Sequence, residues 1–453
     1  MKIKMREKLA YAVGDVGTNL AWTFPAAFLS IYLTDIVGIS AKITGTIFLI
    51  ARLLDGASDL VMGIIVDKTH TRMGKARPWI LWSTLPMAIC VVLLFNVPGS
   101  LHMDGKILYV GILYTLLGAV FYTANNTAYN TMTSLIATDS KDRVQLNSMR
   151  FLFAMATILT ITTFSVNIMG AFGGGQSGYT AVSIIFAAGC VVAFAITFFG
   201  TREKTEFFQR SPEAGEPKIS LKARIMLLVR NKYFLLAVLL FLAYYGISAL
   251  SNISVYYSQY VLGDANLMGM LSLATYIPQV IGMLFIAPIL SKFGKRFCCL
   301  LGLGISLLGY VICAVGATAL PVLLAGLCIK NIGMVPITAA LIPFVADTVE
   351  YGDWKTGHRI EGTTYSCTSF GIKVGSGLGG ALMGWLLDAG GYIPNAAAQT
   401  ESALFAMKGL YIYLPAILSL GLGLILYFFD VEKIYPTIEA DLKARQESRS
   451  ERG

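Results

Sequence analysis

Charged residues are scarce in this sequence. Asp, Glu, Lys and Arg make up 13% of the 453 residues, whereas 56% of the residues are hydrophobic. An ordinary soluble domain has about 25% charged residues. Apolar runs of about 20 residues, the length that crosses the hydrocarbon core of a bilayer, recur along the whole chain. The composition therefore excludes a large soluble domain and indicates a polytopic, all-α membrane protein.

Histidine is rare, and the cysteines show no motif. The three histidines, His70, His102 and His358, fall between apolar runs, so no His-based catalytic group is expected on facing helices. The seven cysteines lie mostly within apolar runs and lack paired spacing. Such placement argues against a disulfide framework and a metal cluster. We therefore predict that the protein is not an enzyme and needs no cofactor.

Twelve apolar stretches predict transmembrane helices. They lie near residues 10–35, 41–66, 78–98, 106–134, 147–172, 179–200, 233–262, 265–291, 297–318, 320–347, 362–388 and 404–429. The charged middle segment, 201–232, separates a first half, 1–200, from a second half, 233–430, which a polar tail, 431–453, follows. The basic turn in "DKTHTRMGKARPW" returns in the second half as "SKFGKRF", an internal repeat that many transporters share.

The basic residues are distributed unevenly between the two sides of the membrane. Most Lys and Arg fall in the tails and the loops on the side of both termini, with Lys42 and Lys106 on the opposite side. Positive loops stay in the cytoplasm, which predicts cytoplasmic termini, a cytoplasmic middle loop and a bacterial inner-membrane location. This placement also explains the net charge of +9 without a nucleic-acid partner.

The stretch "ARLLDGASDL" places charges inside the second apolar run. Asp55 and Asp59 lie one turn apart on one face, with Ser58 adjacent and Arg52 one turn earlier. A carboxylate at the bilayer centre costs roughly 2.5–3.5 kcal/mol or more, so a partner must offset it. Oxygen ligands of this kind suit Na⁺, and the carboxylates alone suit a proton. The alternative is a structural ion network in which Arg52 braces the helices.

Two further stretches of the first half carry polar faces. Asn19 and Trp22 share a face of the first span, and Asn126, Tyr129 and Asn130 share a face of the fourth. Amides can hydrogen-bond sugar hydroxyls, and aromatic rings can pack against sugar C–H groups. We predict that these five residues contact a sugar. Single polar residues such as Asn125 can instead join neighbouring helices.

The second half also carries polar and basic residues within its spans. Asn252 lies on the seventh span, Lys330 on the tenth and Lys373 on the eleventh. Burying a lysine in a membrane is costly, as burying an aspartate is, so each buried lysine is expected to have a partner or a function. Lys373 is expected to pair with a second-span aspartate or to reach the substrate. Lys330 is either a counter-ion to an aspartate or a receptor for an anionic substrate.

Charged residues near the cytoplasmic ends of the spans suggest a gate. Acids at the end of the tenth span are expected to face the basic loops of the other half and to part as the halves rock. The predicted gating residues are Arg72, Lys75, Arg77, Asp347, Glu350, Asp353 and Arg359. The alternative is a solvated charged loop at 345–362.

Several motifs together resemble one known family. "LLDGASD", "DKTHTRMGKARPW", "YLTDIVG" and "ADTVEYGDWKTGHRIEG" are similar to motifs of the glycoside–pentoside–hexuronide cation symporters, a branch of the major facilitator superfamily that includes the melibiose carrier. The similarity extends from about residue 8 to residue 430. It implies the major facilitator fold, with two six-helix halves that provide alternating access.

The resemblance also implies roles for single residues. Asp55 and Asp59 match the family's cation-binding aspartates, and Thr123 matches its fourth-span threonine. Lys373 and Arg150 match a lysine and an arginine of the family's binding site. The departure at Ser58, where the melibiose carrier has asparagine, leaves the choice between Na⁺, Li⁺ and H⁺ open.

The sugar-binding positions depart from the melibiose carrier. Its two sugar-binding aspartates fall on Asn19 and Asn126, and its stacking tryptophan falls on Asn130. The lost negative charge, together with Lys330, makes a glucuronide plausible, and a neutral pentoside or short oligosaccharide equally so. The expected function is cation-coupled sugar symport by a monomer within membrane lipid. The alternative is a sugar uniporter or exchanger without ion coupling.

Overall fold

The protein is all-helical in the part that the structure describes. This computed structural model describes residues 4–137, 140–203, 226–358 and 361–450. The first half forms α1 (Met5–Ile31), α2 (Ala41–Lys68), α3 (Arg77–Leu94), α4 (Met103–Thr115), α5 (Thr123–Ile136), α6 (Ser140–Ala171) and α7 (Gly175–Gly200). A π-helical segment, Tyr32–Val37, extends α1, and another, Leu116–Tyr122, joins α4 to α5 without a break.

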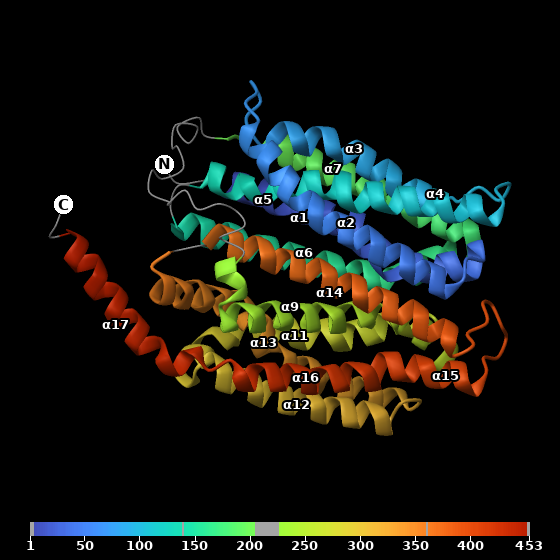
Figure 1. Cartoon of the computed structure of the whole chain (residues 1–453). Helices are drawn as coiled ribbons and strands as arrows, with labels where there is room; N and C mark the ends of the chain where they lie inside the picture. The colour runs from blue at the N-terminus through green and yellow to red at the C-terminus, as the bar shows by residue number, and fades with distance from the viewer. Residues whose placement is uncertain (1–3, 138–139, 204–225, 359–360, 451–453) are drawn as a thin grey trace. The chain divides into compact units, whose positions relative to one another are not determined.

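The second half continues the same pattern (Figure 1). Its helices are α9 (Lys232–Leu250), α10 (Ser254–Tyr256), α11 (Leu267–Phe293), α12 (Lys295–Val315), α13 (Leu320–Thr356), α14 (Glu361–Ala389), α15 (Glu401–Lys408), α16 (Leu414–Phe428) and α17 (Val431–Ser450). Short 3₁₀ and π-helical segments, Ser251–Ile253, Tyr257–Val261 and Gly409–Tyr413, join α9 to α10, extend α10 and join α15 to α16.

The described helices confirm the predicted spans. When segments that continue without a break are counted together, a helix covers each predicted apolar stretch. Eleven of the described helices are long and apolar enough to cross a membrane. The helix α2 is not among them, because Arg52, Asp55 and Asp59 interrupt its apolar run. The charged residues that are candidates for a functional role in α2 are therefore also the reason why this helix does not qualify as a membrane span by composition.

Two ends differ from the sequence prediction. The tenth span was expected to end at residue 347, but α13 continues to Thr356, so Glu350 and Asp353 lie on a helix rather than in a loop. The polar tail is also helical, as α17. Both extensions are polar. A prediction based on apolar runs therefore places the end of the helix too early.

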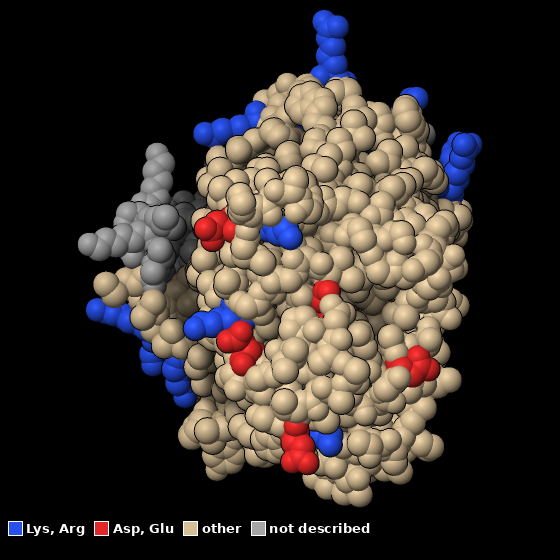
Figure 2. Space-filling model, turned by 90° about the vertical axis from the view of Figure 1, so that its right-hand side faces the viewer, with Lys and Arg blue, Asp and Glu red and all other residues tan. Residues whose placement is uncertain are grey.

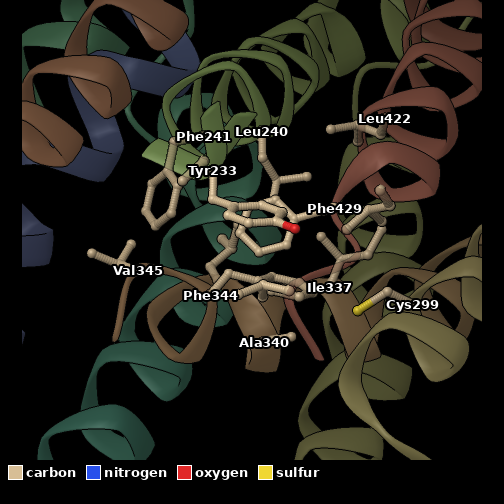
Figure 3. Close-up of a cluster of buried hydrophobic side chains, with 14 of the residues drawn as sticks. Tyr233, Leu240, Phe241, Cys299, Ile337, Ala340, Phe344, Val345, Leu422 and Phe429 are labelled. Atoms are coloured by element: carbon tan, nitrogen blue, oxygen red, sulfur yellow. The ribbon is translucent and has the colours of Figure 1, made fainter. Parts of the chain in front are cut away.

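The chain packs into two compact units. The first comprises Met1–Arg210, Leu250–Leu273 and Gly377–Tyr411, and the second comprises Ser211–Ala249, Ala274–Ser376 and Ile412–Gly453. In the first unit α1 packs against both α6 and α7. In the second unit aromatic and aliphatic side chains from α9, α12, α13 and α16 form one core, shown in Figure 3. Phe344 and Phe429 meet there with ring centroids 4.8 Å apart.

Large apolar side chains are exposed along the helices. Phe199 is 79% exposed, Val315 83% and Leu284 67%. A soluble monomer rarely exposes apolar surface on this scale. Lipid contact is the physical reason for these exposed apolar side chains along the helices. Figure 2 looks onto the ends of the helices, from the right-hand side of Figure 1, and charged side chains are few there too.

The repeated basic turn has two features in common in both units, a glycine with positive φ and a glutamate cap, although the first turn is longer. Gly74 and Gly294 have φ of +117° and +84°, which glycine tolerates at no steric cost. In the first unit the Glu203 carboxylate accepts backbone N–H bonds from residues 75–77, at 2.6–2.9 Å. In the second unit Glu432 accepts bonds from the backbone of Lys295 and Arg296, at 2.6 and 3.0 Å. Each carboxylate therefore caps the following helix N-terminus.

Candidate functional site

A buried carboxylate on α2 lies at the centre of one polar cluster. Asp55 is 1% exposed, and its two oxygens have different partners. Arg52 Nη1 donates to Oδ2 at 3.0 Å, and the Thr123 hydroxyl donates to Oδ1 at 2.6 Å. The two donors come from α2 itself and from the start of α5. Charge-assisted bonds of this kind are the strong ones.

The backbone and rings around this cluster fix its geometry. The π-helical segment ends directly before Thr123, and π-bulges in helices occur frequently at functional sites. The Arg52 guanidinium lies 4.0 Å from the Trp22 ring centroid, and that ring contacts Tyr122 at 4.8 Å. A Cβ on Gly377 of α14 would lie 2.8 Å from Arg52 Cβ, so glycine is required for this close packing. The predicted sugar contact Trp22 thus also supports Arg52.

Ser58 and Asp59 lie one turn further along α2. The Ser58 hydroxyl donates to the Asp55 carbonyl at 2.9 Å, which leaves its oxygen lone pairs as acceptors. Asp59 is half-buried. The four predicted cation ligands therefore come from α2 and the start of α5. Among the described residues no group of three or more His, Cys, Asp and Glu forms a metal cluster. A monovalent cation here would rely on hydroxyl as well as carboxylate oxygens.

A second ion pair joins α1 to α6. Arg150 donates from Nε and Nη2 to the Asp15 carboxylate, at 2.6 and 3.3 Å, and from Nη2 to Asn130 at 2.9 Å. Asp15 also accepts a bond of 3.1 Å from the Tyr129 hydroxyl. The Arg150 guanidinium lies 4.4 Å from the Tyr129 ring centroid. The structure therefore brings together the predicted residues Tyr129, Asn130 and Arg150, around an aspartate that was not assigned to the site.

The remaining first-half amides have different surroundings. Asn19 donates to the Asp15 carbonyl at 2.8 Å and accepts from Thr23 at 3.2 Å. Asn126 is half-buried on α5. Asn125 instead donates to Ser83 and Thr84 of α3, at 3.0 and 3.1 Å. Asn125 thus joins α5 to α3, which agrees with the helix-joining interpretation of that residue.

The second unit has a polar cluster without a charged group at its centre. The hydroxyls of Tyr244 on α9 and Thr338 on α13 are 2.7 Å apart, and Gln279 on α11 hydrogen-bonds to Tyr244. None of these three residues was assigned to the site from the sequence. Their spacing within apolar helices was the available signal.

The predicted residues of the second half are dispersed. Lys330 is 7% exposed on α13, and its ammonium lies 5.3 Å from the Tyr310 ring centroid of α12. Lys373 is half-buried on α14. Asn252 lies on the short 3₁₀ segment and is half-buried within the first unit.

The predicted gating residues make bonds within their own units. Arg77 donates to the Phe198 carbonyl at 2.8 Å, and Lys75 contributes a backbone N–H to the Glu203 cap. Asp347 pairs with Lys295 at 2.5 Å. The Tyr435 hydroxyl of α17 donates to Glu350. Of the others, Arg72 is exposed, Asp353 is half-buried, and Arg359 lies outside the described residues.

A cluster that sequence reasoning missed surrounds Asp35, at the end of α1's π-helical extension. The hydroxyls of Tyr260 and Tyr392 both donate to the Asp35 carboxylate, and the Asn395 amide donates to its carbonyl. Burial and the nearby Asp35 charge raise the pKa of Tyr392 above its usual value, so its phenol stays a donor at neutral pH. We call these four residues the tyrosine clasp. They are far apart in sequence, which explains why no local pattern showed the cluster.

Glycines of α14 and α2 allow close packing within the first unit. A Cβ on Gly384 would overlap the Ala41 carbonyl oxygen, and one on Gly45 would lie 3.0 Å from that of Ala381. The start of α2 and the end of α14 therefore touch through their backbones. Long apolar helices with buried ion pairs and polar faces between them define a polytopic membrane transporter.

Comparisons with known proteins agree with this class. Residues 10–433 match the family model described as MFS/sugar transport protein. The chain is 32% identical to an isoprimeverose transporter of Lactiplantibacillus pentosus, over 97% of this chain and 91% of that protein. It is 30% identical to a glucuronide carrier protein homolog of Escherichia coli strain K12, over 98% and 94%. The crystal structure of the nucleoside transporter NupG superposes with a TM-score of 0.66 at 13% identity, covering 94% of this chain and all of that one.

The chain therefore belongs to the MFS/sugar transport protein family, and it has the major facilitator fold. The resemblance inferred from the sequence motifs is confirmed, because the family match covers nearly the whole chain. Transporters of this type are not enzymes, which agrees with the scarcity of histidine.

Proposed function

We propose that the protein imports a sugar or short glycoside together with a monovalent cation, by alternating access. The single observation that carries the proposal is the Asp55 cluster. A carboxylate that is 1% exposed among apolar helices accepts a hydroxyl bond on one oxygen and an arginine bond on the other. Such a group is costly in a membrane and marks an ion pathway by default.

The proposed cation site consists of Asp55, Ser58, Asp59 and Thr123. Each residue presents an oxygen, and hard cations such as Na⁺ prefer oxygen ligands. Arg52 compensates one negative charge of this group. A cation bound here would bring a further positive charge to a group that contains two carboxylates. A proton on either carboxylate would serve the same electrostatic purpose.

The proposed sugar site lies on α1, α5 and α6. Asn19, Asn126 and Asn130 supply amide groups, Arg150 supplies donors and Trp22 supplies a ring, whereas the predicted contact Tyr129 is 0% exposed and packs against Arg150. Amides and ring faces are the groups that suit sugar hydroxyls and C–H surfaces. Both relatives named above carry sugar names, isoprimeverose and glucuronide. From the second half we include Lys373, Asn252, and the Tyr244 and Thr338 pair.

The rest of the proposal concerns movement and topology. The bonds of Arg77 and Asp347 brace each unit internally. Units braced in this way are suited to move as bodies, and the predicted gate of charges on the cytoplasmic side fits that movement. We propose that both termini face the cytoplasm and that the transporter works as a monomer in the inner membrane.

The test uses the full chain in proteoliposomes with an imposed Na⁺ or H⁺ gradient. The probes are labelled isoprimeverose and labelled methyl β-D-xyloside. The wild type should accumulate a probe only when the driving gradient is present. Asp55→Asn should still exchange the probe in counterflow but should not accumulate it. Asp104→Asn, which changes an exposed carboxylate at the start of α4, is the matched control and should behave as the wild type.

The competing function is a uniporter or exchanger in which the Arg52–Asp55 pair is only structural. The 3.0 Å pair is the observation that favours it. It predicts counterflow without accumulation in the wild type, under every gradient. Accumulation that persists in a well-folded Asp55→Asn protein would also remove Asp55 from the coupling mechanism.

A further inference from the structure

The Asp15–Arg150 pair determines which charge the sugar site presents. An arginine without a counter-charge on a sugar-binding face would favour a sugar carboxylate, which it binds through two parallel N–H bonds. Here the Nε and Nη2 edge of Arg150 is already engaged by Asp15. The Arg150 and Asp15 side chains are 16% and 11% exposed. The pair is therefore a largely desolvated ion pair with no net charge.

Asp15 is held in this position by more than Arg150. The Tyr129 hydroxyl shares its one proton between the Tyr11 carbonyl, at 2.6 Å, and Asp15, at 3.1 Å. The Tyr129 ring lies against the Arg150 guanidinium. A Cβ on Gly14 would overlap the Tyr129 ring, so the absence of a side chain at residue 14 permits this approach.

To bind Arg150 through two N–H groups, an incoming carboxylate would have to displace Asp15 from the Nε and Nη2 edge, or Asn130 from Nη2 on the other edge. The first displacement would leave Asp15 buried without its counter-charge, which is strongly unfavourable.

The Arg52 guanidinium of the same unit is also engaged. Arg52 pairs with Asp55 at 3.0 Å, and its guanidinium faces the Trp22 ring. Lys330, which suggested an acidic substrate at the level of sequence, faces the Tyr310 ring of the second unit. Both the Arg52 guanidinium and the Lys330 ammonium therefore already have a contact in place of a sugar carboxylate.

We propose that Asp15 is a specificity-determining residue. Its carboxylate occupies the Nε and Nη2 edge of Arg150 and thereby restricts the transporter to neutral glycosides. The proposal rests on the proposed function, sugar import. Arg150 then offers the sugar its remaining N–H donors, which suit hydroxyl and ring oxygens rather than a carboxylate. Replacing Asp15 with a neutral residue frees the bidentate edge of Arg150 and opens the site to sugar acids.

The experiment compares probes that differ only at C6. The probes are labelled methyl β-D-glucoside with methyl β-D-glucuronide, and labelled methyl β-D-galactoside with methyl β-D-galacturonide. Uptake into vesicles that contain the full chain gives a ratio of neutral to acidic sugar for each pair. The wild type should prefer the neutral member, and Asp15→Asn should lower the ratio by about tenfold or more, equivalent to ~1.4 kcal/mol. Asp15→Glu, which keeps the charge, should restore part of the preference.

A matched control is available between the same two helices. Lys8 of α1 pairs with Asp142 of α6 at 2.6 Å, which is the reverse polarity of the Asp15–Arg150 pair. Asp142→Asn therefore weakens an ion pair between α1 and α6 outside the sugar site. It should leave the neutral-to-acidic ratio at its wild-type value. If Asp142→Asn lowers the ratio as much as Asp15→Asn does, helix packing rather than charge at Arg150 controls specificity, and the proposal is wrong.

The outcomes also separate this proposal from sugar transport itself. A wild type that prefers the acidic members overturns the neutral-glycoside proposal but supports sugar import. A wild type that takes up none of the four probes, nor isoprimeverose, contradicts both. Should Asp15→Asn fail to fold, the wild-type ratio and the Asp15→Glu ratio still decide, because both require the neutral preference.

Discussion

The polar clusters of the two units are built from different chemistry. In the first unit Asp55 and Asp15 are each paired with an arginine and bonded by a hydroxyl, at 2.6 and 3.1 Å respectively. In the second unit the central contact is between two neutral hydroxyls, Tyr244 and Thr338. Charge that could respond to a cation is thus concentrated on the first unit. Neutral donors and acceptors that could hydrogen-bond to sugar hydroxyls occur in both units.

This difference suggests a division of labour. Carboxylates respond strongly to a cation, whereas neutral hydroxyls respond weakly, because only the former change their electrostatic energy by a full charge. Substitutions in the Asp55 cluster should therefore alter the dependence of transport on the coupling ion, and substitutions of Tyr244 and Thr338 should alter only the affinity for the sugar. The repeated basic turn shows that the two halves nevertheless share a common scaffold.

The sharpest way to break the comparison is to remove one hydroxyl from each cluster while keeping its shape. Thr123→Val deletes the donor to Asp55, and a hydrogen bond to a charged group contributes about 1.5–3 kcal/mol. We expect at least a roughly tenfold weaker apparent affinity for the coupling ion. Thr338→Val should instead weaken the apparent sugar affinity with little change in ion dependence.

Initial uptake rates over a range of ion concentrations, at fixed sugar, measure this effect. Protein amount in the membrane is the control for folding. Equal changes in ion dependence for Thr123→Val and Thr338→Val would show that the two clusters do not divide the work.

The second prediction concerns the feature that the units share. Glu203→Gln and Glu432→Gln each replace a charged cap of a helix N-terminus with a neutral one. Because an amide oxygen accepts these bonds more weakly, each variant should lose about 1 kcal/mol of stability, seen as a thermal shift of a few degrees. Thermal unfolding in detergent gives the measurement. If only one variant is destabilised, the repeated turns are alike in shape but not in energetic importance.

The third prediction concerns the tyrosine clasp, which lies in the first unit. Tyr392→Phe removes one hydroxyl donor to Asp35 and keeps the ring packed against Tyr256 at 5.4 Å. If opening of the tyrosine clasp limits the rate of transport, Tyr392→Phe should change the turnover rate a few-fold and leave the ion dependence of transport unchanged. Counterflow kinetics separate rate from affinity. An altered ion dependence would connect the clasp to the Asp55 cluster and weaken the proposed division.

The fold could be predicted from the sequence to a large extent. Apolar runs of membrane length identify the spans, because a lipid-exposed helix must be apolar wherever it starts and ends. The continuation of α13 to Thr356 and the helix α17 could not be found in this way, since their residues are polar. The repeated turn letters correspond in the structure to two glycines with positive φ, Gly74 and Gly294. Their caps, Glu203 and Glu432, come from distant positions that no local pattern reveals.

The candidate site was only partly predictable. Periodicity placed Asp55, Ser58 and Asp59 on one face, but the partner of Asp55 on α5 came from family resemblance. Asp15 lies one turn before Asn19 on the first span, but its pairing with Arg150 depends on how α1 and α6 pack. Hydrogen bonds between helices are set by three-dimensional packing, which periodicity within one helix does not contain.

The smallest effect is expected at Lys330. In the second unit its ammonium lies 5.3 Å from the Tyr310 ring centroid, and a cation–π contact of this kind contributes about 0.5–2 kcal/mol. The cost of burying an ammonium offsets that gain, so Lys330→Met should leave stability unchanged or slightly higher. Uptake of neutral glycosides and its ion dependence should stay within about twofold of the wild type, because a twofold change corresponds to only ~0.4 kcal/mol. Vesicle uptake and thermal unfolding of the same preparations provide the measurement. A large loss of ion coupling in Lys330→Met would show that the second unit also carries charge chemistry, and the contrast between the units would have to be abandoned.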